Sequence, residues 1–327
     1  MSKILITTTP FGDKNRLPLN LLQEKNIDYL INPFNKKLTE DELVELVPDF
    51  DVIIAGTEPI TKKVMSRANN LKMISRVGIG LDSVDLLAAE DMGITVSYTP
   101  DAPAPAVAEL TVGMMLTLLR SVHVSNSQMH LGDWHRYFGR RLSEVTIGII
   151  GVGRIGQRVL EHLTGFSSPK VLVNDIHVKD NIQDRYNIEW VDKEEIYKRS
   201  DIVTLHLPLT AETKNMITER HLLAMKTNAI IINTSRGGII NEDSLYKVMQ
   251  SGHLSGAAID VFDTEPYGGN LNKIDRCLLT AHMGSMSIDC RTRMEIEATE
   301  EAIRFLTNKT LKSIVPEEEY DIQRKGL

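Results

Sequence analysis

Residues 145–163 read V-T-I-G-I-I-G-V-G-R-I-G-Q-R-V-L-E-H-L, and this stretch decides the fold of the second half of the chain. Its first part is a short β-branched apolar run, which is typical of a buried strand. Gly151, Gly153 and Gly156 then form a glycine-rich turn, and a helical pattern follows. Glycine suits such a turn because it has no Cβ. The stretch therefore predicts a strand, a tight turn and a helix.

Outward from this unit, apolar β-rich runs alternate with helical segments on both sides. Towards the C-terminus five more runs follow, namely K-V-L-V-N-D, D-I-V-T-L-H, A-I-I-I-N-T, A-A-I-D-V-F and C-L-L-T-A. Towards the N-terminus stand I-L-I-T, D-Y-L-I, D-V-I-I-A, K-M-I-S-R-V and I-T-V-S-Y. Strands that alternate with helices imply parallel sheets covered on both faces. We expect an α/β protein with two doubly wound parallel-sheet domains.

The length of 327 residues fits about two domains of ordinary size, with a cleft expected between them. Three prolines in residues 99–105 forbid regular structure and mark a junction. A largely apolar helix of about 25 residues is predicted from Ala106 onward.

Composition excludes several classes of function. The formal net charge is -7 and the basic residues are scattered, so no nucleic-acid partner is expected. No apolar run reaches the length of a membrane span, and the N-terminal one is too short for a signal peptide. Cys277 and Cys290 match no metal-ligand spacing and are interpreted as packing residues with free thiols. We therefore expect a cytoplasmic protein without a bound metal.

The glycine-rich turn predicts a dinucleotide site. A G-x-G-x-x-G pattern alone also occurs in turns for steric reasons, but here it opens a helix inside a βαβ unit. The backbone amides of Arg154 and Ile155 are the expected pyrophosphate ligands. Asp175 ends the next strand, 24 residues after Gly151, where a carboxylate can bind the ribose hydroxyls. It would repel a 2'-phosphate, so NAD is favoured over NADP; the alternative is a plain surface charge.

Three reactive side chains follow three strands of the second series: Arg236, Glu265 and His282. In an open parallel sheet, ligands bind beyond the carboxyl ends of the strands. Reduction of a 2-keto acid needs a cation and a proton donor, which arginine and a carboxylate-paired histidine supply. Taken singly, Arg236 is as readily a surface charge, Glu265 a turn residue and His282 a structural histidine. Their coincidence at one edge favours catalysis.

The chain resembles the family of D-isomer-specific 2-hydroxyacid dehydrogenases, which includes phosphoglycerate, glyoxylate and hydroxypyruvate enzymes. The matching stretches occur in order from about residue 77 to residue 284. They are S-R-V-G-I-G-L-D-S-V-D, A-E-L, G-V-G-R-I-G, H-L-P-L-T-A-E-T, N-T-S-R-G-G, D-V-F-D-T-E-P and T-A-H-M-G. The series is specific for the family and not for a substrate.

The resemblance implies site residues and partners beyond those derived above. It gives His282 the role of acid/base, Glu265 that of its partner and Arg236 that of the substrate clamp. It implies that the backbone amides of Val77 and Gly78 bind the substrate carboxylate. Further cofactor contacts are implied for His206, Pro208, Thr213, Thr234 and Asp260. Members usually form homodimers, to which residues 106–131 and the arm around Trp134 would contribute.

The resemblance also implies the domain division. Residues 1–100 and 290–327 would form a flavodoxin-like substrate domain, and residues 101–289 a Rossmann NAD-binding domain. The expected activity is hydride transfer between NAD(H) and C2 of a small D-2-hydroxy or 2-keto acid.

One departure from the phosphoglycerate enzymes bears on the substrate. Where they tend to carry an Arg-Ser-x-Thr stretch, this chain reads A-G-T-E-P-I-T, so Glu58 stands where a phosphate-binding cation is expected. If Glu58 faces the substrate, an unphosphorylated one is favoured; the alternative is a solvated loop charge. Two other functions stay open: a nicotinamide-sensing corepressor-like protein, and a formate or phosphite dehydrogenase. Formate enzymes carry Gln at the place of Glu265, whereas the triad leaves phosphite oxidation open.

Overall fold

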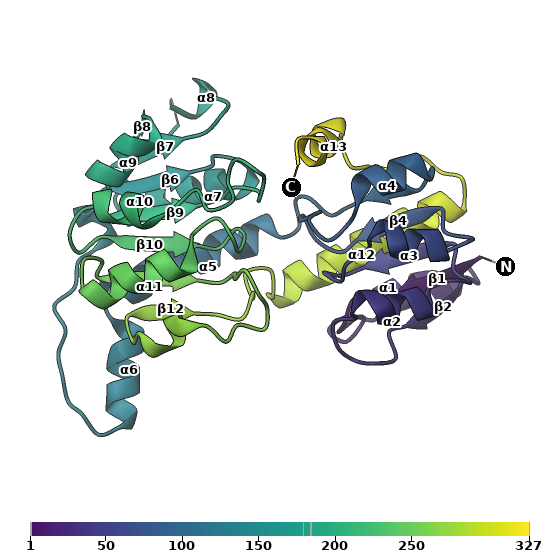
Figure 1. The fold of residues 1–327 in the computed structure, drawn as a ribbon, viewed down its shortest axis with the longest axis horizontal. Coiled ribbons are helices and arrows are strands. Elements are labelled where there is room, and N and C mark those ends of the chain that lie inside the picture. Colours follow the sequence, from purple (N-terminus) through teal and green to yellow (C-terminus); the bar gives the residue numbers. More distant parts are fainter. Residues whose placement is uncertain (1, 179, 184, 327) are drawn as a thin grey trace. The chain divides into compact units, whose positions relative to one another are not determined.

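The computed structural model describes residues 2–178, 180–183 and 185–326, and the chain divides into two units. Unit 1 comprises Met1–Pro103 and Met286–Leu327, and unit 2 comprises Ala104–Ser285. Both are α/β units built on one parallel sheet each (Figure 1). The prediction of two doubly wound parallel-sheet domains is confirmed.

Unit 1 contains a five-stranded sheet in the order β2-β1-β3-β4-β5, with all pairs parallel. This is the flavodoxin-like order. The five predicted runs form its strands: β1 (Lys3–Ile6), β2 (Asp28–Ile31), β3 (Val52–Ala55), β4 (Met73–Arg76) and β5 (Thr95–Ser97). The connecting helices are α1 (Leu17–Glu24), α2 (Glu40–Leu46), α3 (Lys62–Arg67) and α4 (Leu86–Asp91). The central strand β3 is completely buried, which explains its unbroken apolar run V-I-I-A.

Two helices from the C-terminal end complete unit 1. Helix α12 (Ile288–Leu306) begins at the N-cap Ser287 and packs on β3 and β4, where Ser75 Oγ donates to the Ala298 carbonyl at 2.8 Å. Helix α13 (Glu317–Arg324) was not predicted, because E-E-E-Y-D-I-Q-R carries no apolar stripe. Polar contacts hold it: Gln323 accepts from the Leu86 N–H and donates to the Val84 carbonyl.

Unit 2 contains a seven-stranded parallel sheet in the order β12-β11-β10-β9-β6-β7-β8. The six predicted runs form six of the strands, and the order reverses at β6 as in a Rossmann sheet. The strands are β6 (Ile147–Ile150), β7 (Val171–Asn174), β8 (Ile188–Trp190), β9 (Ile202–Leu205), β10 (Ile230–Asn233), β11 (Gly256–Ile259) and β12 (Cys277–Leu279). The sequence did not predict β8, which has only three residues and lies at the sheet edge.

Helices cover both faces of this sheet (Figure 1). The helices of unit 2 are α5 (Ala104–Leu119), α6 (Val122–His130), α7 (Arg154–Leu163), α8 (Asp180–Gln183), α9 (Lys193–Arg199), α10 (Glu219–Ala224) and α11 (Glu242–Ser251), of which α6 and α8 extend away from the sheet. Short 3-10 turns lie at Leu142–Glu144, Thr164–Phe166 and Asn270–Lys273.

The long helix predicted from Ala106 is in fact two helices. Ser121 has a left-handed backbone, with φ of 51°, and separates the buried α5 from α6, which has no buried residue. In the part of the chain that the structure describes, no single helix is long and apolar enough to cross a membrane. Helices α5 and α6 reach that length and composition only as a pair bent by 64°.

Candidate active site

The glycine-rich turn joins β6 to α7 and has the shape of a phosphate cradle. Gly151 has φ of 96°, and a Cβ there would lie 2.3 Å from the His206 carbonyl oxygen. A Cβ at Gly156 would lie 2.1 Å from the Gly151 oxygen, so both positions exclude a side chain. Around Gly153, by contrast, a Cβ would meet nothing within 4 Å. The first and third glycines therefore close the turn, and the second leaves open space at the helix N-terminus.

Two further features of the turn fit a dinucleotide. No side-chain hydrogen bond caps α7 at Gly153, so the positive end of the helix, with the Arg154 and Ile155 amides, faces that open space. Asp175 follows β7, and its Oδ2 accepts from the Val152 N–H at 2.6 Å. Its Oδ1 accepts from the His177 N–H at 3.0 Å. The carboxylate is thus held beside the glycine turn, while Ile176 stays exposed next to it.

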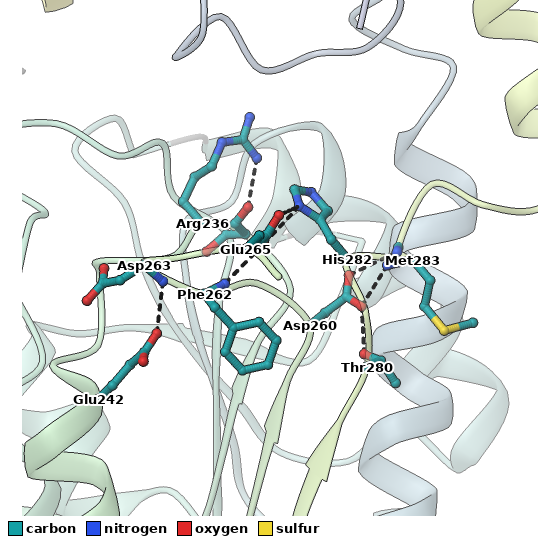
Figure 2. A network of polar contacts seen from close by, with 11 residues as sticks. Arg236, Glu242, Asp260, Phe262, Asp263, Glu265, Thr280, His282 and Met283 are labelled. Atoms are coloured by element: carbon teal, nitrogen blue, oxygen red, sulfur yellow. Dashed lines mark hydrogen bonds and ion pairs between the residues drawn. The ribbon is translucent and has the colours of Figure 1, made fainter. Parts of the chain in front are cut away.

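Glu265 and His282 form the centre of a second polar group, at the carboxyl edge of the same sheet. His282 Nδ1 lies 2.9 Å from Glu265 Oε2 and 3.1 Å from Oε1 (Figure 2). The two side chains come from the loops after β12 and β11, and both are partly exposed, at 42% and 32%. Because Glu265 binds Nδ1, it favours the imidazole with a proton on that nitrogen and leaves Nε2 for another partner.

Arg236 lies in the loop after β10, and that loop contacts the one that carries Glu265. A Cβ on Gly237 would lie 2.0 Å from the Phe262 carbonyl oxygen, so the two backbones touch at this glycine. Asn233 Nδ2 donates to the Arg236 carbonyl at 2.8 Å, and Arg236 Nη1 donates to the Ser235 carbonyl at 2.7 Å. The structure therefore brings the three predicted catalytic residues to neighbouring loops of one sheet edge.

The other predicted cofactor residues lie at the same edge, but several of their polar groups bind within the protein. Thr213 Oγ1 donates to the Pro208 carbonyl at 2.7 Å, inside its own turn. Thr234 Oγ1 lies 2.9 Å from the Thr111 hydroxyl of α5 and is buried. His206 Nε2 lies 3.1 Å from the Thr204 hydroxyl, and burial lowers the pKa of this histidine to about 3. His206 is therefore neutral at physiological pH.

The Asp260 carboxylate also accepts hydrogen bonds from residues of unit 2. It is 1% exposed, and its carboxylate accepts from Thr280 Oγ1 at 2.6 Å and from the Met283 and Gly284 amides, both at 2.9 Å (Figure 2). These partners surround His282 in the chain.

In unit 1 the predicted amides of Val77 and Gly78 already have acceptors. The Val77 N–H donates to the Ala55 carbonyl at 2.8 Å, and the Gly78 N–H donates to Thr99 Oγ1 at 2.7 Å. Their role in binding the substrate carboxylate stays a prediction. Within the described ranges, no hydrogen bond uses the N–H groups of the next two residues, Ile79 and Gly80.

Glu58 is buried rather than solvated. It is 2% exposed, and its Oε1 accepts from the Thr7 hydroxyl and from the Gly56 N–H, the latter at 2.8 Å. The alternative of a solvated loop charge is wrong. The structure gives Glu58 a role in joining the ends of β1 and β3.

Both cysteines are free and buried, as predicted from their spacing. Burial raises the pKa of the Cys277 thiol to about 12 and that of Cys290 to about 11. Neither thiol is activated. Among the described residues, no group of three or more His, Cys, Asp or Glu side chains is arranged to hold a metal ion.

Comparison with known proteins identifies the family. Residues 112–284 match the model of the D-isomer specific 2-hydroxyacid dehydrogenase NAD binding domain. The D-3-phosphoglycerate dehydrogenase of Methanocaldococcus jannaschii is 36% identical over 284 residues, which are 85% of this chain and 54% of that relative. The chain thus spans about half the length of that protein. The hydroxypyruvate reductase of Thermotoga maritima is 33% identical, and the match covers 83% of this chain and 90% of the relative.

Solved structures give the same result for the fold. The D-lactate dehydrogenase of Aquifex aeolicus, determined with NAD and lactic acid, superimposes with a TM-score of 0.82 at 25% identity. The match covers 94% of this chain and 96% of that one. The glycine cradle lies within the residues that match the NAD binding domain. The same matched range contains Arg236, Glu265 and His282. The chain belongs to the D-isomer specific 2-hydroxyacid dehydrogenase family and uses NAD as its cofactor.

Proposed function

We propose that this protein catalyses the NAD(H)-dependent interconversion of a small D-2-hydroxy acid and its 2-keto acid. The observation that carries the proposal is the pair formed by His282 Nδ1 and the Glu265 carboxylate, 2.9 Å apart at the carboxyl edge of the NAD-binding sheet. The pair is exposed enough to meet a substrate, and histidine serves as an acid or base near neutral pH.

The roles of the three residues follow from their geometry. When bound, NADH supplies the hydride that adds to C2 of the keto acid. His282 gives the proton from Nε2 to the C2 oxygen and becomes neutral, while Glu265 keeps its hold on Nδ1. Arg236 provides a positive charge for the carbonyl oxygen and the substrate carboxylate. The reverse reaction takes the same proton from the hydroxyl onto Nε2.

We further propose unit 1 as the substrate domain, with the N–H groups of Ile79 and Gly80 binding the substrate carboxylate. The support is the pattern of hydrogen bonds. The N–H groups of Val77 and Gly78 donate within unit 1, whereas among the described residues no hydrogen bond uses those of Ile79 and Gly80. Adjacent backbone N–H groups in a turn form an anion-binding concavity. A chain with Pro in place of Ile79 would lose one of these donors and should show a raised KM for every 2-keto acid.

The proposed substrate is unphosphorylated. The support is Glu58, a carboxylate that follows β3 and is 2% exposed, so that little water screens its charge. A phosphate bound near it would be repelled, whereas a neutral or hydroxylated tail would not. The relatives include both phosphoglycerate dehydrogenases and hydroxypyruvate and glyoxylate reductases, so they leave this choice open.

The test is NADH oxidation by the purified full chain with glyoxylate, hydroxypyruvate, pyruvate and 3-phosphohydroxypyruvate. We expect at least one unphosphorylated acid to give a higher kcat/KM than the phosphorylated one. Preference for 3-phosphohydroxypyruvate would contradict the substrate proposal alone. No oxidation of NADH with any 2-keto acid would contradict the proposed reaction.

We also propose a homodimer formed through α6 and the arm that follows it. These segments extend from the body of unit 2 (Figure 1) and expose several large apolar side chains, namely Met129, Leu131, Trp134 and Phe138. Such a patch is typical of a protein interface. In sedimentation velocity we expect a dimer, and a monomer for Trp134→Lys combined with Phe138→Lys. We keep the cytoplasm as the proposed location, because both thiols are free.

A further inference from the structure

Backbone hydrogen bonds fix the turn between β4 and α4 at its two ends. Within the described residues, no hydrogen bond uses the N–H groups of Ile79 and Gly80, which lie inside this turn. The first end is fixed at Gly78, whose N–H donates to Thr99 Oγ1 at 2.7 Å and whose carbonyl accepts from the Thr99 N–H at 3.0 Å. The position of the Ile79 and Gly80 N–H groups therefore depends on how firmly the second end is held as well.

A side chain of α13 holds this second end, at the start of α4. Gln323 Oε1 accepts from the Leu86 N–H at 2.9 Å, and Gln323 Nε2 donates to the Val84 carbonyl at 2.8 Å. Both groups of the side-chain amide thus bind the backbone that flanks Asp85. Val84 and Leu86 are buried, at 1% and 0% exposure, so water does not readily replace a bond that is lost there.

The neighbouring residue of α13 makes its contacts away from the turn. Arg324 Nη2 lies 2.8 Å from Glu90 Oε2, near the end of α4, and Arg324 Nη1 lies 2.8 Å from Asp321 Oδ1 within α13. Figure 1 shows α13 beside α4, and the two helices are in contact. Exposed ion pairs such as that of Arg324 contribute little to stability. Gln323 and Arg324 therefore join the same two helices, but Gln323 alone of the two reaches the turn.

We propose that Gln323 is a positioning residue: it fixes the second end of the turn and so holds the Ile79 and Gly80 N–H groups in place for the substrate carboxylate. The inference rests on the proposed function, which assigns the carboxylate to these two groups. It gives α13, which the sequence did not predict, a part in substrate binding. Every 2-keto acid carries the carboxylate, so the effect should not depend on the tail of the substrate.

The first experiment measures steady-state kinetics of the full chain. Gln323→Leu removes both hydrogen bonds and keeps about the same size of side chain. KM should rise roughly five- to tenfold for glyoxylate and hydroxypyruvate alike, since an unmade hydrogen bond at a buried backbone group is costly. The value of kcat and the affinity for NADH should change less than about twofold, as expected when only substrate binding is weakened.

A second variant keeps the test open if Gln323→Leu does not fold. Gln323→Glu retains an acceptor for the Leu86 N–H but places another acceptor against the Val84 carbonyl. Its KM should also rise, again by the same factor for both acids. Wild-type KM in a folded Gln323 variant would overturn the inference. A loss of NADH affinity as large as the rise in KM would overturn it as well, because the glycine cradle lies in unit 2.

Arg324→Gln is the matched control on the same helix. It removes the ion pair with Glu90 and leaves the contacts of Gln323 in place. KM for both acids should stay within about twofold of the wild type, because the pair is exposed. An equal rise of KM in Arg324→Gln and Gln323→Leu would overturn the assignment to Gln323, since any loosening of α13 would then have the same effect.

Hydrogen exchange without substrate separates this inference from the proposed reaction. The Ile60 N–H donates to the Ser83 carbonyl at 2.7 Å, and the Asp85 N–H donates to the Ile60 carbonyl at 3.0 Å. These two amides report on the second end without contacting Gln323. Both should exchange several times faster in Gln323→Leu and at the wild-type rate in Arg324→Gln.

The exchange rates also show which of the two proposals fails. If the wild type reduces no 2-keto acid but exchange is faster in the Gln323 variants, the proposed function fails and the role of Gln323 in fixing the turn stands. Unchanged exchange at Ile60 and Asp85 in both Gln323 variants would overturn that role, whatever the activity of the wild type.

Discussion

The carboxyl edges of the two sheets each carry a glutamate after a strand, but the structure treats the two side chains in opposite ways. Glu265 of unit 2 is 32% exposed and binds the imidazole of His282. Glu58 of unit 1 is 2% exposed and binds Thr7 and the Gly56 amide of its own unit. The position after a strand therefore predicts that a side chain lies at the edge of the sheet. Whether it is available for chemistry depends on its other hydrogen-bond partners.

Two histidines of unit 2 repeat the contrast. His206 follows β9 and His282 follows β12, yet burial lowers the pKa of His206 to about 3. A histidine that stays neutral across physiological pH cannot donate a proton as an imidazolium. His282 Nδ1 contacts the Glu265 carboxylate, whereas His206 Nε2 lies beside the Thr204 hydroxyl. The comparison thus supports His282 rather than His206 as the proposed acid/base.

The largest expected effect tests the exposed pair. His282→Gln should lower kcat at least about a hundredfold, because removal of a general acid typically costs that much. NADH affinity should stay nearly constant. His206→Gln is the comparison variant and should lower kcat far less. A folded His282→Gln protein with near-normal kcat would remove this histidine from the mechanism.

Glu58→Gln tests the buried side of the comparison. The amide keeps one acceptor but adds a donor near Thr7, so we expect a loss of about 1 to 3 kcal/mol in the free energy of unfolding. Urea denaturation measures it. If Glu58 repels a phosphorylated tail as proposed, Glu58→Gln should also raise kcat/KM for 3-phosphohydroxypyruvate alone. An unchanged order of kcat/KM among the 2-keto acids would show that Glu58 acts only within unit 1.

Asp175→Ala sharpens the cofactor assignment. Loss of the carboxylate should reduce the preference for NAD over NADP by about fivefold, since unit charges about 4 Å apart in water interact by about 1 kcal/mol. The ratio of kcat/KM for the two cofactors measures this preference. Asp175→Asn keeps the size of the side chain and separates charge from shape. A wild-type enzyme that prefers NADP would contradict the assignment before any variant is made.

The smallest expected effect is a pH dependence at Asp201, at the amino edge of the unit 2 sheet. Burial alone would raise its pKa, but the Thr146 amide, Arg140 and Lys226 together lower the pKa below its ordinary value. The folded carboxyl therefore binds its proton more weakly than the unfolded one. Its contribution, about 1 kcal/mol, should be complete above about pH 4 and lost as the pH falls through the folded pKa. The stability difference between wild type and Asp201→Asn should shrink accordingly in acid.

Sequence alone sufficed for those parts of the fold that depend on apolar runs. The strands β3, β6 and β10 are buried on both faces, so their runs of Val and Ile could be recognised without knowledge of their neighbours. The cradle was equally visible, because its three glycines stand within six residues at the predicted strand-to-helix turn. Helix α13 was missed because polar contacts rather than an apolar stripe hold it, and the break at Ser121 was missed because it lies in one backbone angle.

The sequence predicted those site residues that can be recognised from a reactive side chain placed directly after a predicted strand. Arg236, Glu265 and His282 were found in this way, and their catalytic roles stay predictions. The sequence could not show which N–H groups near residue 77 already have acceptors, because that depends on neighbouring segments. The Val77 and Gly78 N–H groups donate to Ala55 and Thr99, which are distant in sequence. The burial of Glu58 likewise depends on Thr7, 51 residues away.

The close approach at Gly237 limits how this enzyme can be changed. Any side chain at that position would overlap the Phe262 carbonyl. A substitution there would therefore displace the loop that carries Arg236, the loop that carries Glu265, or both. Random mutagenesis of these loops should therefore return mostly inactive chains. If unit 1 is the substrate domain, as proposed, engineering for other 2-keto acids is better directed at its loops, where a change does not displace the groups proposed to handle the proton.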